Sequence, residues 1–193
     1  DLRLDDNPAL RLAAQSSELS IVTVINPDWF TEGRYGLASM GERRWQFLQQ
    51  SLADLSDSLA RKGYVLHLFR GDPVTVLAEL IEQGQFQRVV TSRQFGFNEA
   101  SQLAVLDRRF PDVTFSAIDT YTLFNLSGLP MPVSDIPETF SRFRRKAEKM
   151  TVEEPRGIPA HLPAAIELDR ACSALGVQNT ESARSQRLVG GEA

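Results

Sequence analysis

Apolar residues along the first two thirds of the chain alternate between short continuous runs and helical stripes. Short runs rich in β-branched and aromatic residues are typical of buried strands, and they predict strands at residues 20–26, 64–69, 88–91 and 113–118. From residue 41 to residue 62 the apolar spacing changes to three and four positions, which predicts a helix with one apolar face. That face consists of Trp45, Leu48, Leu52, Leu55 and Leu59. Two further helices are predicted at residues 73–84 and 98–110.

Capping signals indicate where these helices begin and end. The pairs Asn7-Pro8 and Asp72-Pro73 predict helix starts, because the Asn or Asp side chain accepts a hydrogen bond from a free backbone N–H. Proline suits the first helical position because its missing N–H would have no partner there. Gly63 is expected to end the long helix, and the helix from residue 73 is expected to end near Gly84.

This order of elements predicts an α/β fold. Strands separated by helices of this length form right-handed βαβ units, which build a parallel sheet with helices on both faces. We therefore predict a doubly wound, Rossmann-like, mainly parallel sheet followed by an irregular C-terminal extension. The first strand of such a sheet usually lies in its middle, and here the pattern requires that strand before Asp1. We therefore expect the chain to be part of a longer protein.

The chain after Phe124 has a different character. The run from Gly128 to Pro132 interrupts regular structure, and a short helix is predicted to start near Ile136-Pro137. A second short helical stretch is predicted near residues 164–175. Because prolines, glycines, alanines and polar residues dominate from Thr151 onward, this part cannot bury enough apolar surface to be a second domain.

Composition places the chain among ordinary water-soluble domains. Its 193 residues are 42% hydrophobic and 24% charged, enough for one sizeable core. The net charge of −4 gives no overall attraction to nucleic acid or anionic membranes. No apolar run approaches the roughly 20 residues that span a bilayer. Cys172 is the only cysteine, and with His67 and His161 as the only histidines a zinc site is disfavoured. We expect a reducing, cytoplasmic location without a metal or a membrane.

Three blocks of the sequence resemble the photolyase/cryptochrome family. They are the run DLRLDDNPAL at residues 1–10, MGERRWQFLQQSLADL at residues 40–55 and LPMPVSDIPETFSRFRR at residues 129–145. The second and third are most similar to the DASH branch of cryptochromes. The resemblance implies the fold of the N-terminal α/β antenna domain of that family at residues 1–126. Residues 127–193 would be the interdomain linker, ending where a FAD-binding helical domain begins.

The resemblance also implies a function. The chain would be the antenna-chromophore domain of a DASH-type cryptochrome or DNA photolyase, holding 5,10-methenyltetrahydrofolate that absorbs near-ultraviolet or blue light. FAD in a C-terminal domain of the parent would receive the excitation and split pyrimidine dimers in DNA, a lyase reaction. The chain alone is expected to be inactive. The alternatives are a blue-light signalling photoreceptor without repair activity and an unrelated nucleotide-binding α/β module. The sequence does not decide the oligomeric state.

The candidate cofactor-binding residues are Glu99 and Asn98, in the segment after the third predicted strand. Open α/β sheets bind ligands at the carboxyl ends of their strands. In the family, the glutamate that matches Glu99 hydrogen-bonds the pterin ring of an antenna folate. The residues alone favour a simpler interpretation, in which Asn98 caps the next helix and Glu99 complements the positive helix terminus. Some relatives bind a deazaflavin, a second flavin or no antenna.

The remaining candidates are weaker. The predicted short helix carries a group of cations, which either contact DNA phosphates or form a solvated face interleaved with Glu138 and Glu148. These cations are Arg142, Arg144, Arg145, Lys146 and Lys149. His67 and Trp45 are interpreted as packed core residues. The sequence has no G-x-G-x-x-G run and no phosphate-binding loop, and two scattered histidines support no nucleophilic triad. No catalytic residue is therefore assigned.

Overall fold

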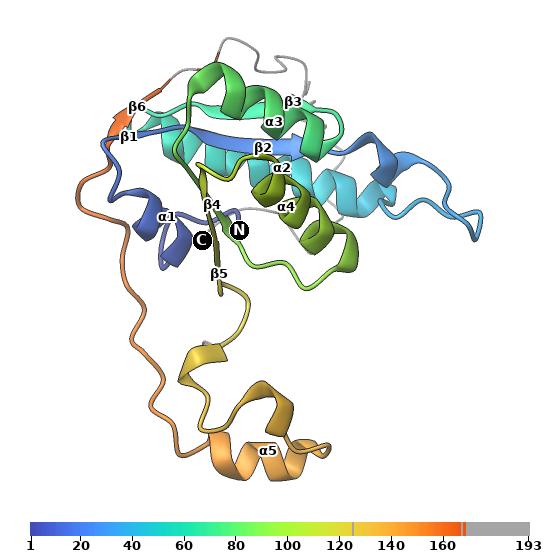
Figure 1. The fold of residues 1–193 in the computed structure, drawn as a ribbon, viewed down its shortest axis with the longest axis vertical. Helices are drawn as coiled ribbons and strands as arrows, with labels where there is room; N and C mark the ends of the chain where they lie inside the picture. The colour runs from blue at the N-terminus through green and yellow to red at the C-terminus, as the bar shows by residue number, and fades with distance from the viewer. Residues whose placement is uncertain (125, 167, 169–193) are drawn as a thin grey trace, which may run out of the picture.

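The computed structural model describes residues 1–124, 126–166 and 168. From residue 21 to residue 118 strands and helices alternate along the chain, and a helix and a short strand follow in the extension (Figure 1). The helices are α1 (Pro8–Ala13), α2 (Glu42–Ala60), α3 (Pro73–Gly84), α4 (Phe97–Arg109) and α5 (Phe140–Ala147). The strands are β1 (Glu18–Leu19), β2 (Ile21–Ile25), β3 (Leu66–Arg70), β4 (Arg88–Ser92), β5 (Thr114–Ile118) and β6 (Ala164–Ala165). The predicted strands and helices of the first 118 residues are thus confirmed to within a few residues at their ends.

The strands pair in parallel, as the βαβ pattern predicts. Strand β2 pairs with β3, with Ile21 opposite Leu66, and helix α2 makes the connection between them. Strand β4 pairs with β5 in the same way, with Arg88 opposite Thr114, and helix α4 connects them. The third pair joins the two-residue strands β1 and β6. The α/β class is confirmed, and the sheet consists of separate parallel pairs.

The described strands do not join the two main pairs. Among the described residues, no strand hydrogen-bonds to both β2 and β4. Each of these strands therefore keeps one edge without a strand partner in the described part of the chain. A further strand between the two pairs would satisfy those backbone groups, at about 1–3 kcal/mol for each buried one. The central strand that the pattern requires stays a prediction.

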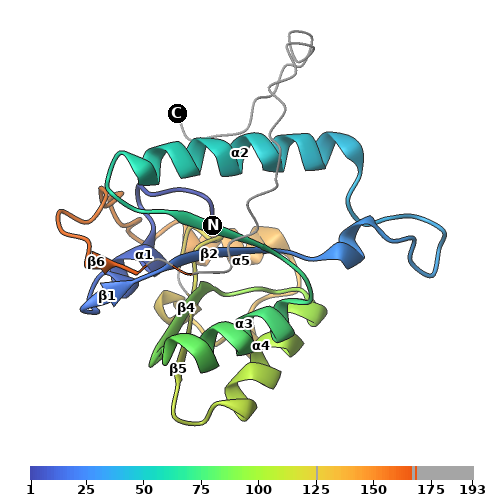
Figure 2. The same cartoon turned by 90° about the horizontal axis from the view of Figure 1, so that it is seen from above.

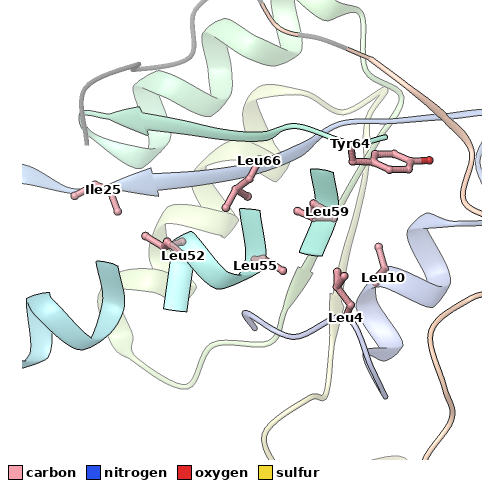
Figure 3. Close-up of a cluster of buried hydrophobic side chains, with 8 residues drawn as sticks. All are labelled: Leu4, Leu10, Ile25, Leu52, Leu55, Leu59, Tyr64 and Leu66. Carbon is pink, nitrogen blue, oxygen red and sulfur yellow. The ribbon is translucent and has the colours of Figure 1, made fainter. Parts of the chain in front are cut away.

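Helices cover both faces of the β2–β3 pair. Figure 2 shows α2 along one face, with α3 and α4 on the opposite side. On the α2 side, buried leucines of the helix pack with Ile25 and Leu66 of the strands (Figure 3). The buried members of this cluster are Leu4, Leu10, Ile25, Leu52, Leu55, Leu59, Tyr64 and Leu66. The predicted apolar face of the long helix is therefore confirmed as a core face, and Trp45 packs against the cluster and edge-on against Phe30.

His67 lies on the other face of strand β3. Because side chains alternate along a strand, His67 points away from the α2 side that Leu66 and Leu68 share. It is 3% exposed, so the prediction of a packed core histidine is confirmed. Within the described residues its Nδ1 atom has no hydrogen-bond partner. An unpaired polar atom of this kind costs stability rather than adding to it.

The predicted helix ends are confirmed in most cases. The Asn7 side chain accepts a hydrogen bond from the Leu10 N–H at 3.0 Å, and Asp72 accepts one from the Thr75 N–H at 2.8 Å. Gly63, just after α2, has a φ of 79°, a left-handed conformation that glycine adopts without strain. The end of α3 differs, because the residue with left-handed backbone is Gln85, with a φ of 49°, rather than Gly84.

The extension returns to the first residues of the chain. In Figure 1 an extended segment rises from α5 to β6, beside α1 and β1. Asp6 and Arg156 are joined twice: the Asp6 N–H donates to the Arg156 carbonyl, and the Asp6 carboxylate accepts from the Arg156 N–H, each at 2.9 Å. The Tyr64 hydroxyl donates to the Pro163 carbonyl. These contacts hold residues 156–166 against the α/β layers, although the sequence there is typical of a linker.

One prediction for the extension is wrong in its described part. Residues 164–175 were expected to be helical, but Ala164 and Ala165 form strand β6 beside Glu18 and Leu19. The Ile166 N–H donates to the Leu19 carbonyl, so β1 supplies the backbone partners that a helix would have supplied internally. An alanine-rich run has high helix propensity, and here tertiary pairing overrides it. Residues 169–175, which include Cys172, lie outside the described residues.

Candidate functional site

The candidate site lies where strands β4 and β5 end. Because both strands run in parallel, their carboxyl ends meet at the same edge, and the loop after β4 leads directly into α4. That loop consists of residues 93–96, and it precedes the predicted site residues Asn98 and Glu99. The segment after β5, which starts at Asp119, runs beside it. The fold thus places the predicted residues at the edge where open α/β sheets bind ligands.

A polar cluster joins these two segments. The Arg93 guanidinium donates from Nε to the Asp119 carboxylate at 2.5 Å, and from its terminal nitrogen to the Ala117 carbonyl at 3.2 Å. The second oxygen of Asp119 accepts from the Leu126 N–H at 3.2 Å. The Asp119 side chain is only 11% exposed, so its charge is held by these partners rather than by water. The cluster fixes the loop before α4 against the first residues of the extension.

Glu99 sits in the first turn of helix α4. The N-cap is Gly96, so Phe97, Asn98 and Glu99 occupy the first three helical positions. A Cβ atom on Gly96 would lie 2.1 Å from a Glu99 carboxylate oxygen, which means that this carboxylate lies directly over Gly96. The position suits a negative charge, because the first N–H groups of a helix are partly positive and unpaired. Any side chain at position 96 would displace the Glu99 carboxylate.

The prediction that Asn98 caps α4 is wrong. Asn98 lies inside the helix at the second position, and the N-cap Gly96 has no side-chain hydrogen bond. The capping signal was misplaced by two residues, because Phe97 carries no helix-start signal of its own. Asn98 and Glu99 are both exposed, so the structure leaves both side chains accessible to a ligand.

Exposed aromatic side chains surround this edge. Phe95 and Phe97, on either side of Gly96, are 62% and 85% exposed. After β5, Tyr121 is exposed as well, and its hydroxyl accepts a hydrogen bond from the Gln94 side-chain amide at 3.1 Å. An exposed carboxylate beside exposed aromatic rings is a suitable surface for a flat heterocycle with N–H donors, because the rings offer stacking faces.

Other candidate positions do not contribute to this edge. A recess of about 240 Å³ lies between the end of β3 and α3, and neither Glu99 nor Asn98 lines it. Within the described residues, no three His, Cys, Asp or Glu side chains come together as metal ligands would. No described helix combines the length and apolar character needed to cross a membrane. The cations of α5 are exposed on a separate part of the molecule (Figure 1).

Sequence reasoning missed three residues of the site, namely Arg93, Gly96 and Asp119. The register offers a signal for two of them. Ser92 pairs with Ile118 as the last residues of two parallel strands, so the next residues, Arg93 and Asp119, emerge side by side with opposite charges. Gly96 carried no such signal, because its contact with Glu99 depends on where the helix begins.

Comparisons with known proteins identify the family to which this chain is related. The sequence profile described as DNA photolyase matches residues 1–164. A cryptochrome DASH of Idiomarina loihiensis is 41% identical over 152 residues, which cover 78% of this chain and 34% of that protein. A chloroplastic/mitochondrial cryptochrome DASH of Arabidopsis thaliana is 28% identical in a match that covers the whole of this chain and 36% of that protein.

Solved structures agree with the sequence relatives. The crystal structure of a Synechocystis cryptochrome superposes with a TM-score of 0.82 at 26% identity, covering 89% of this chain and 37% of that one. An archaeal photolyase from Sulfolobus tokodaii, solved with two FAD molecules, shares the fold with a TM-score of 0.73 at 20% identity. The chain thus spans about a third of the length of the relatives that it matches. The family profile covers most of the chain, and the chain therefore belongs to the DNA photolyase family, where it corresponds to the N-terminal α/β domain.

Proposed function

We propose that this chain is the antenna-chromophore domain of a DASH-type cryptochrome or DNA photolyase. In this proposal it supports the repair of cyclobutane pyrimidine dimers in DNA, driven by blue or near-ultraviolet light. The observation that carries the proposal is the accessible Glu99 carboxylate at the carboxyl edge of β4 and β5, in a chain 41% identical to a cryptochrome DASH. Residues 1–126 would form the antenna domain, and residues 127–193 would lead to a FAD-binding helical domain.

The residues at this edge fit a folate. The pterin ring presents adjacent N–H donors on its amino-pyrimidinone edge, and the two oxygens of the Glu99 carboxylate can accept both. Phe95 and Phe97 offer apolar contact for the ring faces, since both are exposed beside Glu99. Asn98 supplies a further amide within the same turn. When bound, 5,10-methenyltetrahydrofolate would supply light absorption, and the protein would supply binding and orientation.

The chemistry of repair belongs to the rest of the proposed protein. Reduced FAD, as FADH⁻, in the helical domain would donate the electron that splits the dimer, and that domain would hold the damaged DNA. Accordingly, the chain by itself is proposed to be inactive as a lyase, and no catalytic residue is assigned in it. A cytoplasmic location stays a prediction.

The folate proposal is tested by Glu99→Gln in the full-length protein. The amide keeps one acceptor oxygen but loses the charge, so affinity should fall by about 1.5–3 kcal/mol, the range for hydrogen bonds to charged groups. The measurement is pterin absorbance per flavin at limiting folate. The matched control is Asp107→Asn, which removes an exposed carboxylate from the other end of the same helix. Equal occupancy in wild type and Glu99→Gln would remove Glu99 from the site.

Repair and signalling are separated by a second measurement on the full-length protein. Dimer-containing DNA is illuminated with blue light in the presence of the protein, and the dimers that remain are counted. Loss of dimers is the expected result. Flavin photoreduction without any loss of dimers would instead favour the signalling photoreceptor.

A further inference from the structure

Helix α5 separates its cations from its apolar residues. Arg142, Arg145 and Lys146 lie at spacings of three and four, so they share one face of the helix, and Lys149 continues this row in the turn that follows. We call these four residues the basic stripe. All four are exposed. The stripe is a property of the helix geometry, because in sequence the same cations are mixed with Glu148 and apolar residues.

A different side of α5 anchors the helix. Ala147 is buried, and Phe143 and Met150 are half-buried on the same side. Met131, from the segment that precedes α5, is buried as well. This apolar side faces protein, and the basic stripe, on a different side of the helix, is exposed to solvent. The orientation therefore does not depend on any contact made by the cations themselves.

The basic stripe has no carboxylate partner among the described residues. The ion pair on α5 joins Arg144 to Glu148 at 3.5 Å, and Arg144 lies outside the stripe. Arg145 donates to the Ser141 carbonyl of its own helix at 3.3 Å, which leaves its charge uncompensated. A solvated face would interleave acids at a spacing of four residues. Glu148, the residue that follows α5, instead pairs with Arg144, which lies outside the stripe.

We propose that the basic stripe contacts the phosphates of double-stranded DNA. This inference rests on the proposed function, in which DNA is the partner of the whole protein, and it adds a contact surface on the α/β side. Arg142 and Lys146 lie about 6 Å apart along the helix axis, at 1.5 Å per residue. Duplex DNA carries one charge per about 1.7 Å of its axis, so neighbouring cations meet phosphates without rearrangement.

The charge distribution favours this partner. The chain as a whole has a net charge of −4, so its attraction to a polyanion has to be local. Helix α5 lies apart from the sheet pairs in Figure 1, and the four cations of the stripe are concentrated on one of its faces. The stripe holds both arginine and lysine, the residues that neutralise phosphates in nonspecific DNA binding.

The test uses the full-length protein and an undamaged 20-base-pair duplex. In the stripe variant, Arg142, Arg145, Lys146 and Lys149 are all replaced by glutamine. The control variant removes the same charge from exposed positions of α2, α4 and the turn after α2, by Arg43→Gln, Arg61→Gln, Lys62→Gln and Arg108→Gln. Fluorescence anisotropy gives Kd between 50 and 200 mM KCl, and the slope of log Kd against log salt reports the number of phosphate contacts, at about 0.9 per phosphate.

The stripe variant should bind the duplex at least about tenfold more weakly at 50 mM KCl, with a slope lower by about 2–4. The control variant should keep the wild-type slope. A charge-preserving variant, Arg142→Lys with Arg145→Lys, should also keep it, which shows that α5 still folds. Equal slopes in the stripe and control variants would overturn the inference while leaving the proposed function intact. A wild-type protein that does not bind DNA would overturn both.

Discussion

The β2–β3 pair and the β4–β5 pair are built alike, each from two parallel strands of five residues joined by a helix, yet they differ in burial. In the first pair Ile25, Leu66, His67 and Phe69 are buried. In the second pair Ser92 alone is buried. The long helix α2 covers the first pair with three buried leucines, whereas α4 covers the second with one buried leucine, Leu106.

This difference in burial indicates that the β2–β3 pair stabilises the fold and that the β4–β5 pair carries the candidate site. The β2–β3 pair and α2 form the apolar cluster, whose energy comes from removing side chains from water. The β4–β5 pair ends in the Arg93–Asp119 cluster, exposed aromatic rings and the Glu99 carboxylate. Binding surfaces need accessible polar and aromatic groups, and these groups cannot also fill a core. A substitution in the first pair should therefore act on folding, and one in the second pair should act on the site.

The largest expected effect tests the core side of this comparison. Leu59 is fully buried, so Leu59→Ala leaves a cavity and should lower the free energy of unfolding by about 2–5 kcal/mol. Val89 on β4 is only half-buried, so Val89→Ala should cost less than half as much. Urea unfolding of the full-length variants gives both values. Equal losses of unfolding free energy in Leu59→Ala and Val89→Ala would contradict the difference in burial between the two strand pairs.

A smaller effect is expected at the site. Asp119→Asn removes the charge that Arg93 and the Leu126 N–H share, so the loop before α4 should loosen at a cost of about 1–3 kcal/mol. A double-mutant cycle with Arg93→Gln should give a coupling of about 0.5–3 kcal/mol. The amides of residues 93–96 should exchange faster with solvent, while those of β2 and β3 should not change. If the losses of stability from Asp119→Asn and Arg93→Gln were additive, the two side chains would not act as one cluster.

The smallest effect concerns the contact between the core and the extension. Tyr64→Phe removes the hydroxyl that donates to the Pro163 carbonyl, at an expected cost of about 1 kcal/mol.

Burial raises the pKa of Tyr64 above its ordinary value of 10.0. Just above pH 10 the Tyr64 hydroxyl therefore stays protonated in the folded protein, whereas the unfolded chain releases this proton. The stability that Tyr64 contributes is thus complete below pH 10 and falls above it. Urea unfolding from pH 8.5 to 11 should show a shallower alkaline loss in Tyr64→Phe than in wild type. A parallel decline in both proteins would mean that Tyr64 is not the group responsible.

Much of the α/β layer follows from local sequence rules. The spacing of leucines between residues 45 and 59 is a property of one helix, so it predicts α2 and its buried face without tertiary information. The caps at Asn7 and Asp72 are equally local, since each side chain bonds a backbone N–H three residues away. The parallel pairing follows from strand and helix lengths alone.

Tertiary structure decided the features that depend on contacts between segments far apart in the chain. Ala164 and Ala165 form a strand because β1 supplies backbone partners from the other end of the chain, and no local rule contains that pairing. Arg93 and Asp119 meet because two parallel strands end in register. The sequence by itself determined the elements and the faces they bury, because propensity and periodicity act within about ten residues. The Arg93–Asp119 cluster of the site depended on a contact between residues far apart in the chain, whose energy exists only once the strands are paired.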